Sequence, residues 1–547
     1  MKSLQIITSS IIVSSLLVGC GGSNNNKMPM IPMIPTTPTE PTTPTNPSPN
    51  LPSLNILPVM IDEDGNLNDG KATYTLNANQ NVDVTINTPN RSWVTPMWRY
   101  NNNPLPLVIR VNRGDDMTLK FNNQLASDST IHWHGFKIPA DMDGGPDYPV
   151  KPNGSKIYSF KMNQPASSLW FHPHPDMQTG KQVYMGLAGV YIIEDDISKE
   201  LEASNQLPSG DKDVVLLVQD RRFDIEANGK RELLYMNGDM DSDGMLGNVV
   251  LVNGSAYPKL EVSTSKYRFR LYNVSNAKNY DFAFSDGREF TIVATDGGLL
   301  KNPVKVNHIM LGAAERVEII ADFSKESVGS KIEFISRAFQ DDNMNMGNGM
   351  GGGNNNNNNM DNQVGGRSPN GTEVSVMRFD VTTVENDNIV IYNTIPQRAE
   401  ITNRIDMSSA NNIGNERQFN MTMSMGGGAM TFVINGKAFD PTRVDEYVQA
   451  NSTEIWNLTN NSPMAHPFHA HAIQWQILSR NGVPSSGVDL GWKDTFLVKA
   501  NESVKIIGRF EPVNVGDYMY HCHILEHEDA GMMGYFRVGD TGNIDNF

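Results

Sequence analysis

The sequence predicts an all-β protein made of several sandwich-like or barrel-like domains, and three observations support this fold class. Between about residues 70 and 540, short runs rich in valine, isoleucine, threonine and aromatic residues are separated by glycine, asparagine, aspartate and proline. Many short strands with regular turns are typical of sandwiches and barrels. Long amphipathic helical patterns are scarce in the same region. The 547 residues, at roughly 150 residues per domain, leave room for about three or four domains.

The strand pattern can be followed along the chain. Examples of the predicted strands are Val82–Ile86, Leu107–Val111, Met117–Phe121, Val214–Val218, Tyr267–Leu271, Val317–Ile320 and Val504–Phe510. The pattern is interrupted near residues 195–211 and again near residues 385–416. We therefore expect three folded domains, at residues 70–196, 211–384 and 416–540.

Residues 1–19 have the features of an export signal. Lys2 supplies a positive charge, and Leu4–Val18 is an apolar stretch too short to span a bilayer comfortably. Small residues precede Cys20, an arrangement that resembles the lipobox of bacterial lipoproteins, in which the cysteine carries the lipid. We expect lipidation of Cys20 and anchoring to a membrane of the bacterial envelope. The alternative is an ordinary signal peptide with an incidental Cys20.

Two stretches have low complexity. Residues 20–69 are expected to form a disordered tether, because the high proline content up to about residue 58 disfavours helix and sheet. Residues 341–366 interrupt the second domain with methionine, glycine and a run of asparagine, which predicts a disordered insert. The methionines of this insert are Met344, Met346, Met350 and Met360.

Composition excludes several classes of protein. A net charge of −17 argues against nucleic acid as a partner, since such proteins carry a basic surface. Two cysteines are too few for a disulfide-rich scaffold or a four-cysteine metal site. Ten of the 11 histidines lie in four short clusters, and only His308 stands apart. Because histidine is the commonest metal ligand, this clustering predicts a metal protein.

Eight of the ten clustered histidines form four His-x-His pairs. These pairs are His132/His134, His172/His174, His469/His471 and His521/His523. On a strand, residues two apart face the same side, so each pair presents two imidazoles to one place. Eight imidazoles exceed the needs of one tetrahedral ion and suit a cluster of several metal ions.

The fourth pair carries a second kind of site. Cys522 lies between its two histidines, so the Cys522 sulfur points to the opposite face of the strand. His527 and Met532 follow at five-residue steps, and His466 can supply a second imidazole. A thiolate, two imidazoles and a weak thioether are the ligands of a blue-copper electron-transfer site. The sequence therefore predicts a one-electron copper beside the histidine cluster.

With these motifs in place, the sequence resembles a three-domain multicopper oxidase from about Trp98 to Val538. The matching stretches include Ile131–Gly135, Trp170–His174, Gln219–Asp224, Ala294–Gly298, His466–His471, Gly491–Asp494 and His521–Met533. The last of these is most similar to bacterial cuprous oxidases. The resemblance implies three cupredoxin-like Greek-key domains, four copper ions and O2 as the electron acceptor.

The resemblance also assigns the copper ligands. It gives the type 1 copper His466, Cys522, His527 and Met532; the type 2 copper His132 and His469; and the type 3 pair His134, His172, His174, His471, His521 and His523. Asp143 and Glu528 match the acidic residues that handle protons near the trinuclear cluster. Oxygen reduction consumes protons, a task suited to carboxylates.

The reductant is the open question at this stage. Thioethers suit Cu(I), and Met425 and Met464 match the positions of substrate-copper ligands in cuprous oxidases. Ser462 stands where that family has an aspartate. We expect Cu(I) to be the electron donor, with copper detoxification as the role. The alternatives are a laccase-like oxidase of phenols or other organic reductants, and a non-catalytic copper-binding protein.

Two further expectations concern the setting of the protein. The residue after Cys20 is not aspartate, which fits sorting to the outer membrane in many Gram-negative bacteria, with the folded part on the periplasmic side. We expect the protein to be a monomer.

Overall fold

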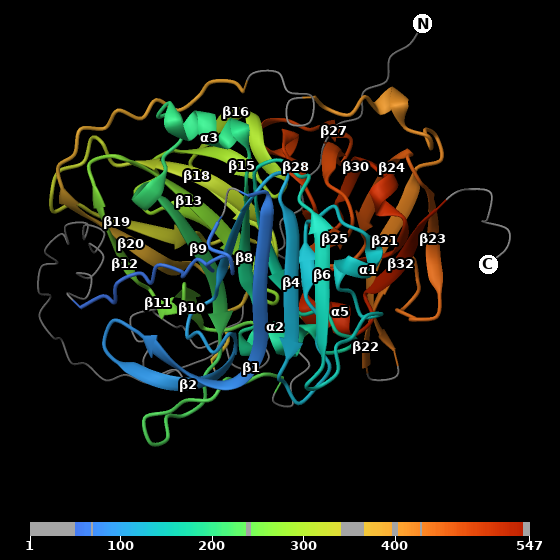
Figure 1. Ribbon diagram of the computed structural model, residues 1–547, viewed down its shortest axis with the longest axis horizontal. Helices are drawn as coiled ribbons and strands as arrows, with labels where there is room; N and C mark the ends of the chain where they lie inside the picture. Colours follow the sequence, from blue (N-terminus) through green and yellow to red (C-terminus); the bar gives the residue numbers. More distant parts are fainter. Residues whose placement is uncertain are drawn as a thin grey trace, which may run out of the picture. The chain divides into compact units, whose positions relative to one another are not determined.

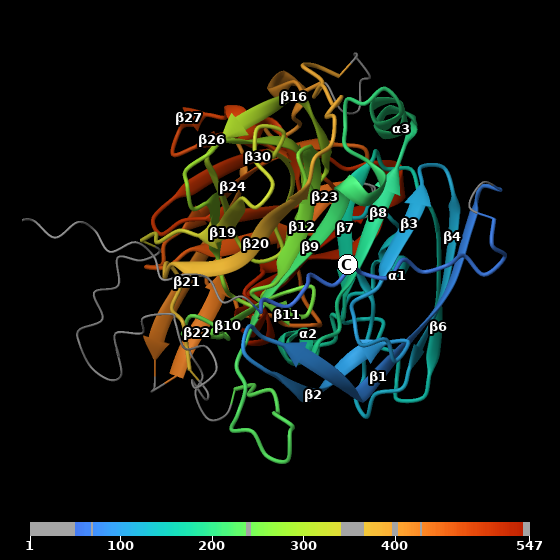
Figure 2. The same ribbon diagram turned by 90° about the vertical axis from the view of Figure 1, so that its left-hand side faces the viewer.

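The computed structural model describes residues 50–66, 69–236, 242–340, 366–395, 403–426 and 429–539, with only the backbone given for Met425, Gly426 and Ala429. The export signal, Cys20 and the methionine-rich insert lie outside the described residues. The three domains belong to one unit, Ser48–Phe547, and Figures 1 and 2 show their strands from two sides, coloured in chain order. The predicted all-β fold is confirmed.

Domain 1 has two sheets and two short helices. Its strands are β1 (Lys71–Asn87), β2 (Ser92–Tyr100), β3 (Val108–Asn112), β4 (Asp116–Asn123), β5 (His132–His134), β6 (Ser155–Lys161), β7 (Ser167–His172) and β8 (Gly189–Glu194). Its helices are α1 (Ala140–Asp143) and α2 (Thr179–Met185). One sheet has the order β3-β8-β7-β5, and β2, β1, β4 and β6 form the other.

Domain 2 follows α3 (Asp196–Ala203) and η1 (Gly210–Lys212). Its strands are β9 (Asp213–Arg221), β10 (Val249–Val252), β11 (Ser255–Ala256), β12 (Lys259–Ser263), β13 (Lys266–Asn273), β14 (Tyr280–Phe284), β15 (Phe290–Thr295), β16 (Gly298–Val306), β17 (His308–Leu311), β18 (Arg316–Asp322), β19 (Lys331–Ser336) and β20 (Val374–Thr383). A parallel contact between β1 and β11 joins a sheet of domain 1 to one of domain 2.

Domain 3 follows η3 (Met407–Ser409). Its strands are β21 (Arg417–Gly426), β22 (Ala429–Ile434), β23 (Val444–Gln449), β24 (Thr453–Asn460), β25 (His466–Ala470), β26 (Trp475–Arg480), β27 (Val483–Pro484), β28 (Trp492–Lys493), β29 (Thr495–Val498), β30 (Ser503–Arg509), β31 (Gly516–Cys522) and β32 (Met533–Gly539). The short helices are η4 (Gly487–Leu490), η5 (Pro512–Asn514) and α5 (Leu525–Asp529).

The three domains repeat one pattern of strand pairing. In each domain, each of the two sheets contains one parallel pair: β1/β4 and β3/β8, then β9/β13 and β12/β20, then β21/β24 and β23/β32. The other pairings within each sheet are antiparallel, as expected for Greek-key sandwiches. Every strand predicted from the sequence overlaps one of these elements.

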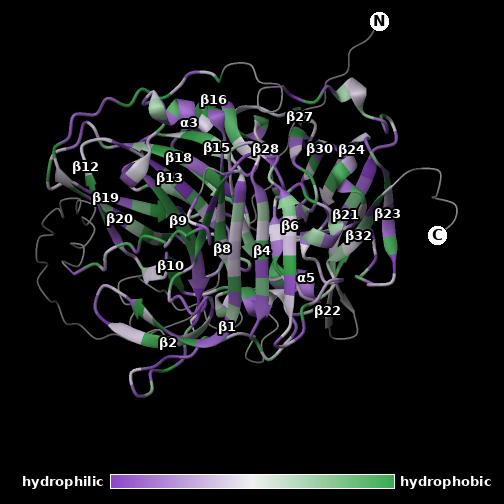
Figure 3. Cartoon of the chain, in the orientation of Figure 1, coloured by the Kyte–Doolittle hydropathy of each residue, from purple (hydrophilic) through white to green (hydrophobic). Residues whose placement is uncertain are grey.

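Each sandwich encloses its own hydrophobic core. Alternate residues of β4 are buried, which places one face of the strand against the core, and Figure 3 shows the matching alternation of hydropathy along β4 and β6. The main cores contain Trp133 in domain 1, Phe269 in domain 2 and Trp456 in domain 3. Among the described residues, no helix has the length and apolar character needed to cross a membrane.

The predicted tether was too long. Leu51, Leu54 and Leu57 are buried, and the backbone amides of Leu54 and Met60 donate to carbonyls of Lys259 and Val108. These leucines recur every three residues between prolines, so an extended segment can bury them while its polar residues face outward. The segment from residue 50 therefore packs on the folded body, although its composition predicts disorder.

Candidate metal centre

Eight histidines from two domains converge on one buried place. In domain 1, β5 pairs with β7 so that His132 lies opposite His172. In domain 3, β25 pairs with β31 so that His469 lies opposite His521. The second histidines of the pairs are His134, His174, His471 and His523, and all eight side chains are at most 1% exposed. The cluster therefore depends on the docking of domain 1 against domain 3.

Several histidines of this cluster have one ring nitrogen hydrogen-bonded to a backbone carbonyl on the side away from the other imidazoles. The Nδ1 atoms of His132 and His469 lie 2.9 and 2.8 Å from the carbonyl oxygens of Asp143 and Asp494. His172 Nδ1 lies 2.9 Å from the carbonyl of Pro173. Such partners fix the tautomer and turn the other nitrogen toward a metal.

The inward-facing nitrogens fit copper. The Nε2 atoms of His132, His172 and His469, and Nδ1 of His134, are buried without a hydrogen-bond partner. Leaving such atoms unpaired is costly, and a bound metal would satisfy them. His521 Nε2 lies 3.4 Å from His174 Nε2 and 3.2 Å from His471 Nε2, a spacing that suits nitrogens aimed at one ion.

The electrostatics of the cluster favour neutral imidazole, the form that binds metal. Burial, followed by the neighbouring imidazoles, lowers the pKa of His134, His469 and His471 well below the ordinary value of 6.5. Burial also lowers the pKa of His174 to about 4. These rings therefore stay uncharged near neutral pH and can bind copper without first losing a proton.

Both predicted acids touch the cluster. Asp143, at the end of α1, places Oδ2 at 2.6 Å from His471 Nδ1. Glu528, on α5, places Oε2 at 3.0 Å from His521 Nδ1 and Oε1 at 3.5 Å from His174 Nε2. Burial by itself raises the pKa of Glu528, but the two histidines lower it overall, well below its ordinary value. Each acid is thus an ionisable group at the edge of the cluster.

A separate site lies on the other side of β31. The Sγ atom of Cys522 is 3.3 Å from His466 Nδ1 and 3.8 Å from His527 Nδ1. The backbone amides of Cys522 and Met532 donate to the carbonyls of Met532 and His527, which closes the loop around the sulfur. All four predicted type 1 ligands are at most 1% exposed. Burial raises the pKa of the Cys522 thiol, so a bound cation is needed to favour the thiolate.

The outer nitrogens of the type 1 histidines also have partners. His527 Nε2 donates to the carbonyl of Ser242 at 2.9 Å, and His466 Nε2 lies 2.8 Å from Ser462 Oγ. Ser462, noted from the sequence only as a replacement for aspartate, therefore orients a copper ligand. Ser242 was missed because nothing in the sequence links domain 2 to His527.

The sequence predicted no role for the carboxylate of Asp494, which also lies beside the cluster. Asp494 lay in a motif quoted for the resemblance, but no role was assigned to it. Its Oδ1 is 3.1 Å from His134 Nε2, and Arg316 donates to both of its oxygens at 2.6 and 2.7 Å. Burial raises the pKa of Asp494, but Arg316 lowers it overall. The pairing of Arg316 with Asp494 spans 178 residues, so sequence spacing could not reveal it.

The other residues singled out from the sequence, Met464, Met425 and His308, lie in different parts of the molecule. Met464 is 2% exposed and belongs to the same core cluster as Cys522 and Met532. Met425 lies in β21 opposite Met430, with its side chain outside the described part of the chain. His308 begins β17 in domain 2, where Nδ1 lies 2.7 Å from Asp281 Oδ1, away from both metal sites.

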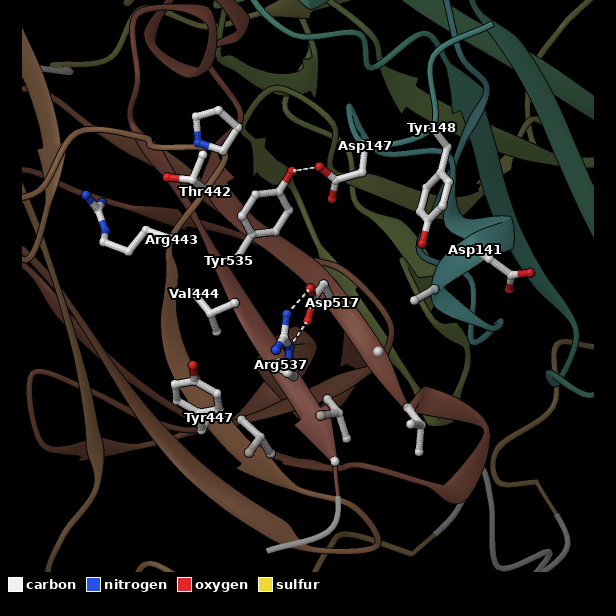
Figure 4. Close-up of a pocket in the computed structure, with 17 residues that line it drawn as sticks. Asp141, Asp147, Tyr148, Thr442, Arg443, Val444, Tyr447, Asp517, Tyr535 and Arg537 are labelled. Carbon is white, nitrogen blue, oxygen red and sulfur yellow. Dashed lines mark hydrogen bonds and ion pairs between the residues drawn. The ribbon is translucent and has the colours of Figure 1, made fainter. Parts of the chain in front are cut away.

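A cleft of about 930 Å³ opens between domains 1 and 3. Figure 4 shows Tyr535 donating to Asp147 across it and Arg537 paired with Asp517 on its floor. α1 lies between this cleft and the cluster, because Ala140 and Asp141 line the cleft while Asp143 contacts His471. None of the lining residues is a predicted copper ligand.

Comparison with known sequences decides the family. Three family profiles described as multicopper oxidase match residues 212–358, 81–198 and 410–542. The chain belongs to the multicopper oxidase family. A relative named multicopper oxidase mco, from Staphylococcus epidermidis, is 34% identical over 445 residues, covering 80% of this chain and 83% of that protein.

Two further similarities agree with this assignment. A laccase from Bacillus subtilis is 30% identical, covering 82% of this chain and 91% of that protein. The crystal structure of McoA multicopper oxidase from Aquifex aeolicus superposes with a TM-score of 0.73 at 31% identity, covering 89% of this chain and 99% of that one. This multicopper oxidase is an oxidoreductase that uses oxygen and binds four copper ions.

The protein supplies the surroundings in which these coppers act. When bound, copper supplies one-electron transfer at the type 1 site and oxygen reduction at the cluster. Cys522 lies directly between His521 and His523, so one short stretch of backbone connects the two sites. The buried ligands exclude water from the reacting groups, while the carboxylates of Asp143 and Glu528 contact imidazoles at the edge of the cluster.

Proposed function

We propose that this multicopper oxidase is a cuprous oxidase that takes electrons from Cu(I) at the type 1 site and serves copper detoxification. Four Cu(I) ions each lose one electron to become Cu(II), and O2 takes up four electrons and four protons to give two water molecules. The observation that carries the proposal is a methionine-bearing hairpin packed beside the type 1 ligands.

The hairpin of β21 and β22 presents its methionines on one face. Met421 and Met423 lie two residues apart on β21, so their side chains share a side. Across the hairpin, Met423 pairs with Phe432, and Met425 pairs with Met430. Both Met423 and Met430 are partly buried against the domain 3 core, leaving part of each side chain reachable.

This face lies next to a type 1 ligand. The ring of Phe432 stacks on His527, with 4.1 Å between ring centroids. Met423 is the cross-strand neighbour of Phe432, and Met464 belongs to the same core cluster. Thioethers bind soft Cu(I) in preference to hard cations. A Cu(I) ion held on this face would deliver its electron through a short path to His527.

Oxygen uptake measured with Cu(I) and with a phenol tests the proposal. We expect efficient Cu(I) oxidation and slow phenol oxidation that added Cu(II) stimulates. Replacing Met423 and Met430 by leucine should raise the KM for Cu(I) several-fold and leave phenol oxidation within twofold. Met310→Leu, a partly buried methionine of domain 2, is the matched control. Fast phenol oxidation indifferent to copper, with poor Cu(I) turnover, would favour the laccase-like alternative.

We also propose that the oxidase is a monomer anchored through a lipid on Cys20, on the periplasmic side of the outer membrane. The support is the lipobox-like sequence before Cys20 and the proline-rich stretch after it. Cys20→Ala should release the protein from the membrane fraction without changing its oxidase activity. Unchanged membrane association of that variant would refute the anchor, and sedimentation of the released protein would test the monomer.

A further inference from the structure

Domain 2 reaches the trinuclear cluster through one arginine. The candidate metal-binding groups among the described residues contain no domain 2 side chain. Arg316, the first residue of β18, is nevertheless 1% exposed and binds both carboxylate oxygens of Asp494 in domain 3. The other hydrogen bonds of its guanidinium go to the carbonyls of Ser168, Ala314 and Asp296 at 3.0–3.2 Å. All five guanidinium N–H groups therefore have an acceptor, and the group is held in one orientation.

Asp494 in turn holds two copper ligands. Its side-chain Oδ1 accepts from Thr495 Oγ1 at 2.9 Å and lies 3.1 Å from His134 Nε2. Its backbone carbonyl lies 2.8 Å from His469 Nδ1. The rings of His134 and His469 stack with 3.7 Å between centroids. One residue thus orients two adjacent imidazoles from different domains.

His134 is oriented opposite to its neighbours. In His132, His172 and His469 the Nδ1 atom has the outer partner and Nε2 faces the cluster without one. In His134 the Nε2 atom has the outer partners and Nδ1 is buried without one. An acceptor at Nε2 selects the tautomer whose Nδ1 lone pair is free for metal. Asp494 is the charged acceptor that does this.

Gly135, the residue after His134, leaves space for the ion pair of Arg316 and Asp494. A Cβ atom added there would lie 2.3 Å from Asp494 Oδ2 and 3.1 Å from Arg316 Nη2. Gly135 also has φ of +86°, a conformation that disfavours other residues. The backbone next to His134 therefore approaches the ion pair more closely than any residue with a side chain could.

We propose that Arg316 is a positioning residue for the trinuclear copper cluster, acting through Asp494 to hold His134 with Nδ1 toward the metal. Domain 2, whose described residues supply no candidate copper ligand, thereby determines the geometry of a cluster built from domains 1 and 3. Lysine cannot replace this arginine, because an ammonium group cannot hold both carboxylate oxygens and three carbonyls in a planar fork.

Arg316→Lys in the copper-loaded protein tests the proposal, with Arg270→Lys as the matched control. Arg270 is also a buried domain 2 arginine that binds a carboxylate through two nitrogens, but its partners, Asp213, Glu318 and Ser168, touch no copper ligand. The readouts are copper retained against a chelator, the type 2 electron paramagnetic resonance signal, the type 3 absorption and the blue type 1 absorption.

We expect Arg316→Lys to weaken trinuclear copper binding by about 10- to 100-fold while the blue absorption stays within a fifth of wild type. Arg270→Lys should keep both. Asp494→Asn, which preserves volume, should reproduce the loss and serves if Arg316→Lys does not fold. Copper affinity within twofold of wild type in the folded variants, or an equal loss in Arg270→Lys, would overturn the proposal.

Discussion

The type 1 site and the trinuclear cluster meet at His521, Cys522 and His523 but are assembled differently. The predicted type 1 ligands, His466, Cys522, His527 and Met532, all belong to domain 3. The trinuclear histidines come in equal numbers from domains 1 and 3, and Asp494 ties two of them to domain 2 through Arg316. The predicted type 1 ligands therefore come from domain 3 alone, and domain 2 adds one outer contact through the Ser242 carbonyl, whereas the oxygen-reducing site depends on the docking of all three domains.

The largest expected effect comes from removing the residue that lies between the regions. Cys522→Ser should abolish the blue absorption and reduce turnover on the order of 10³-fold or more, equivalent to about 4 kcal/mol in activation free energy. The reason is that the thiolate is the strong ligand of the type 1 copper. Absorption spectra and oxygen uptake check both effects. Because the histidines are untouched, type 2 and type 3 signals should persist, and normal turnover would refute the electron path.

The next largest effect is expected from Asp143→Asn, which changes only the surroundings of the trinuclear cluster. Asp143→Asn keeps a group of the same size beside His471 but cannot accept and release protons. We expect turnover to fall about 10²-fold, since general acid–base groups contribute 10² to 10⁴. Stopped-flow reduction of the blue copper should remain at the wild-type rate while reoxidation by O2 slows. Equal slowing of both half-reactions would place the role of Asp143 outside oxygen reduction.

This contrast also explains how much the sequence could predict. The alternation of short strands predicted the all-β fold, and the five-residue steps from Cys522 to His527 and Met532 placed neighbouring ligands together. The sequence could not predict that Arg316 meets Asp494, since only the packing of separate sandwiches brings them together. Composition likewise misassigned residues 50–60, whose spaced leucines are buried by contacts with both domains 1 and 2.

The contact of Asp213 with Arg270 and Arg110 joins domains 1 and 2 without involving a predicted copper ligand, so it can be used to test domain docking independently of copper binding. Asp213, on β9, accepts from Arg270 at 2.7 and 2.9 Å and from Arg110 of domain 1 at 3.3 Å. Asp213→Asn leaves Arg270 partly unpaired in a buried place and should cost about 3 kcal/mol of unfolding free energy at pH 7. Denaturant unfolding of the copper-loaded protein measures the loss.

The same substitution predicts a pH dependence. Burial raises the pKa of Asp213, but Arg270 and Arg268 lower it overall, below its ordinary value of 3.8. A carboxyl with a depressed pKa stabilises the fold above its unfolded pKa, and this stabilisation is lost as pH falls below that value. The difference in stability between wild type and Asp213→Asn should therefore be constant near neutral pH and shrink below about pH 4. A difference that grows on acidification would contradict the assignment.

The smallest effect belongs to the histidine outside both regions. His308 is 44% exposed at its side chain, and its partner Asp281 is also bound by Arg337 at 2.6 Å. Asp281 keeps a cationic partner when the imidazole is removed, so His308→Ala should change the unfolding free energy by less than about 1 kcal/mol. Elemental analysis should find the wild-type copper content, and turnover should be unchanged. A loss of copper in this variant would mean that the ten clustered histidines do not account for all the ligands, and the division into two regions would fail.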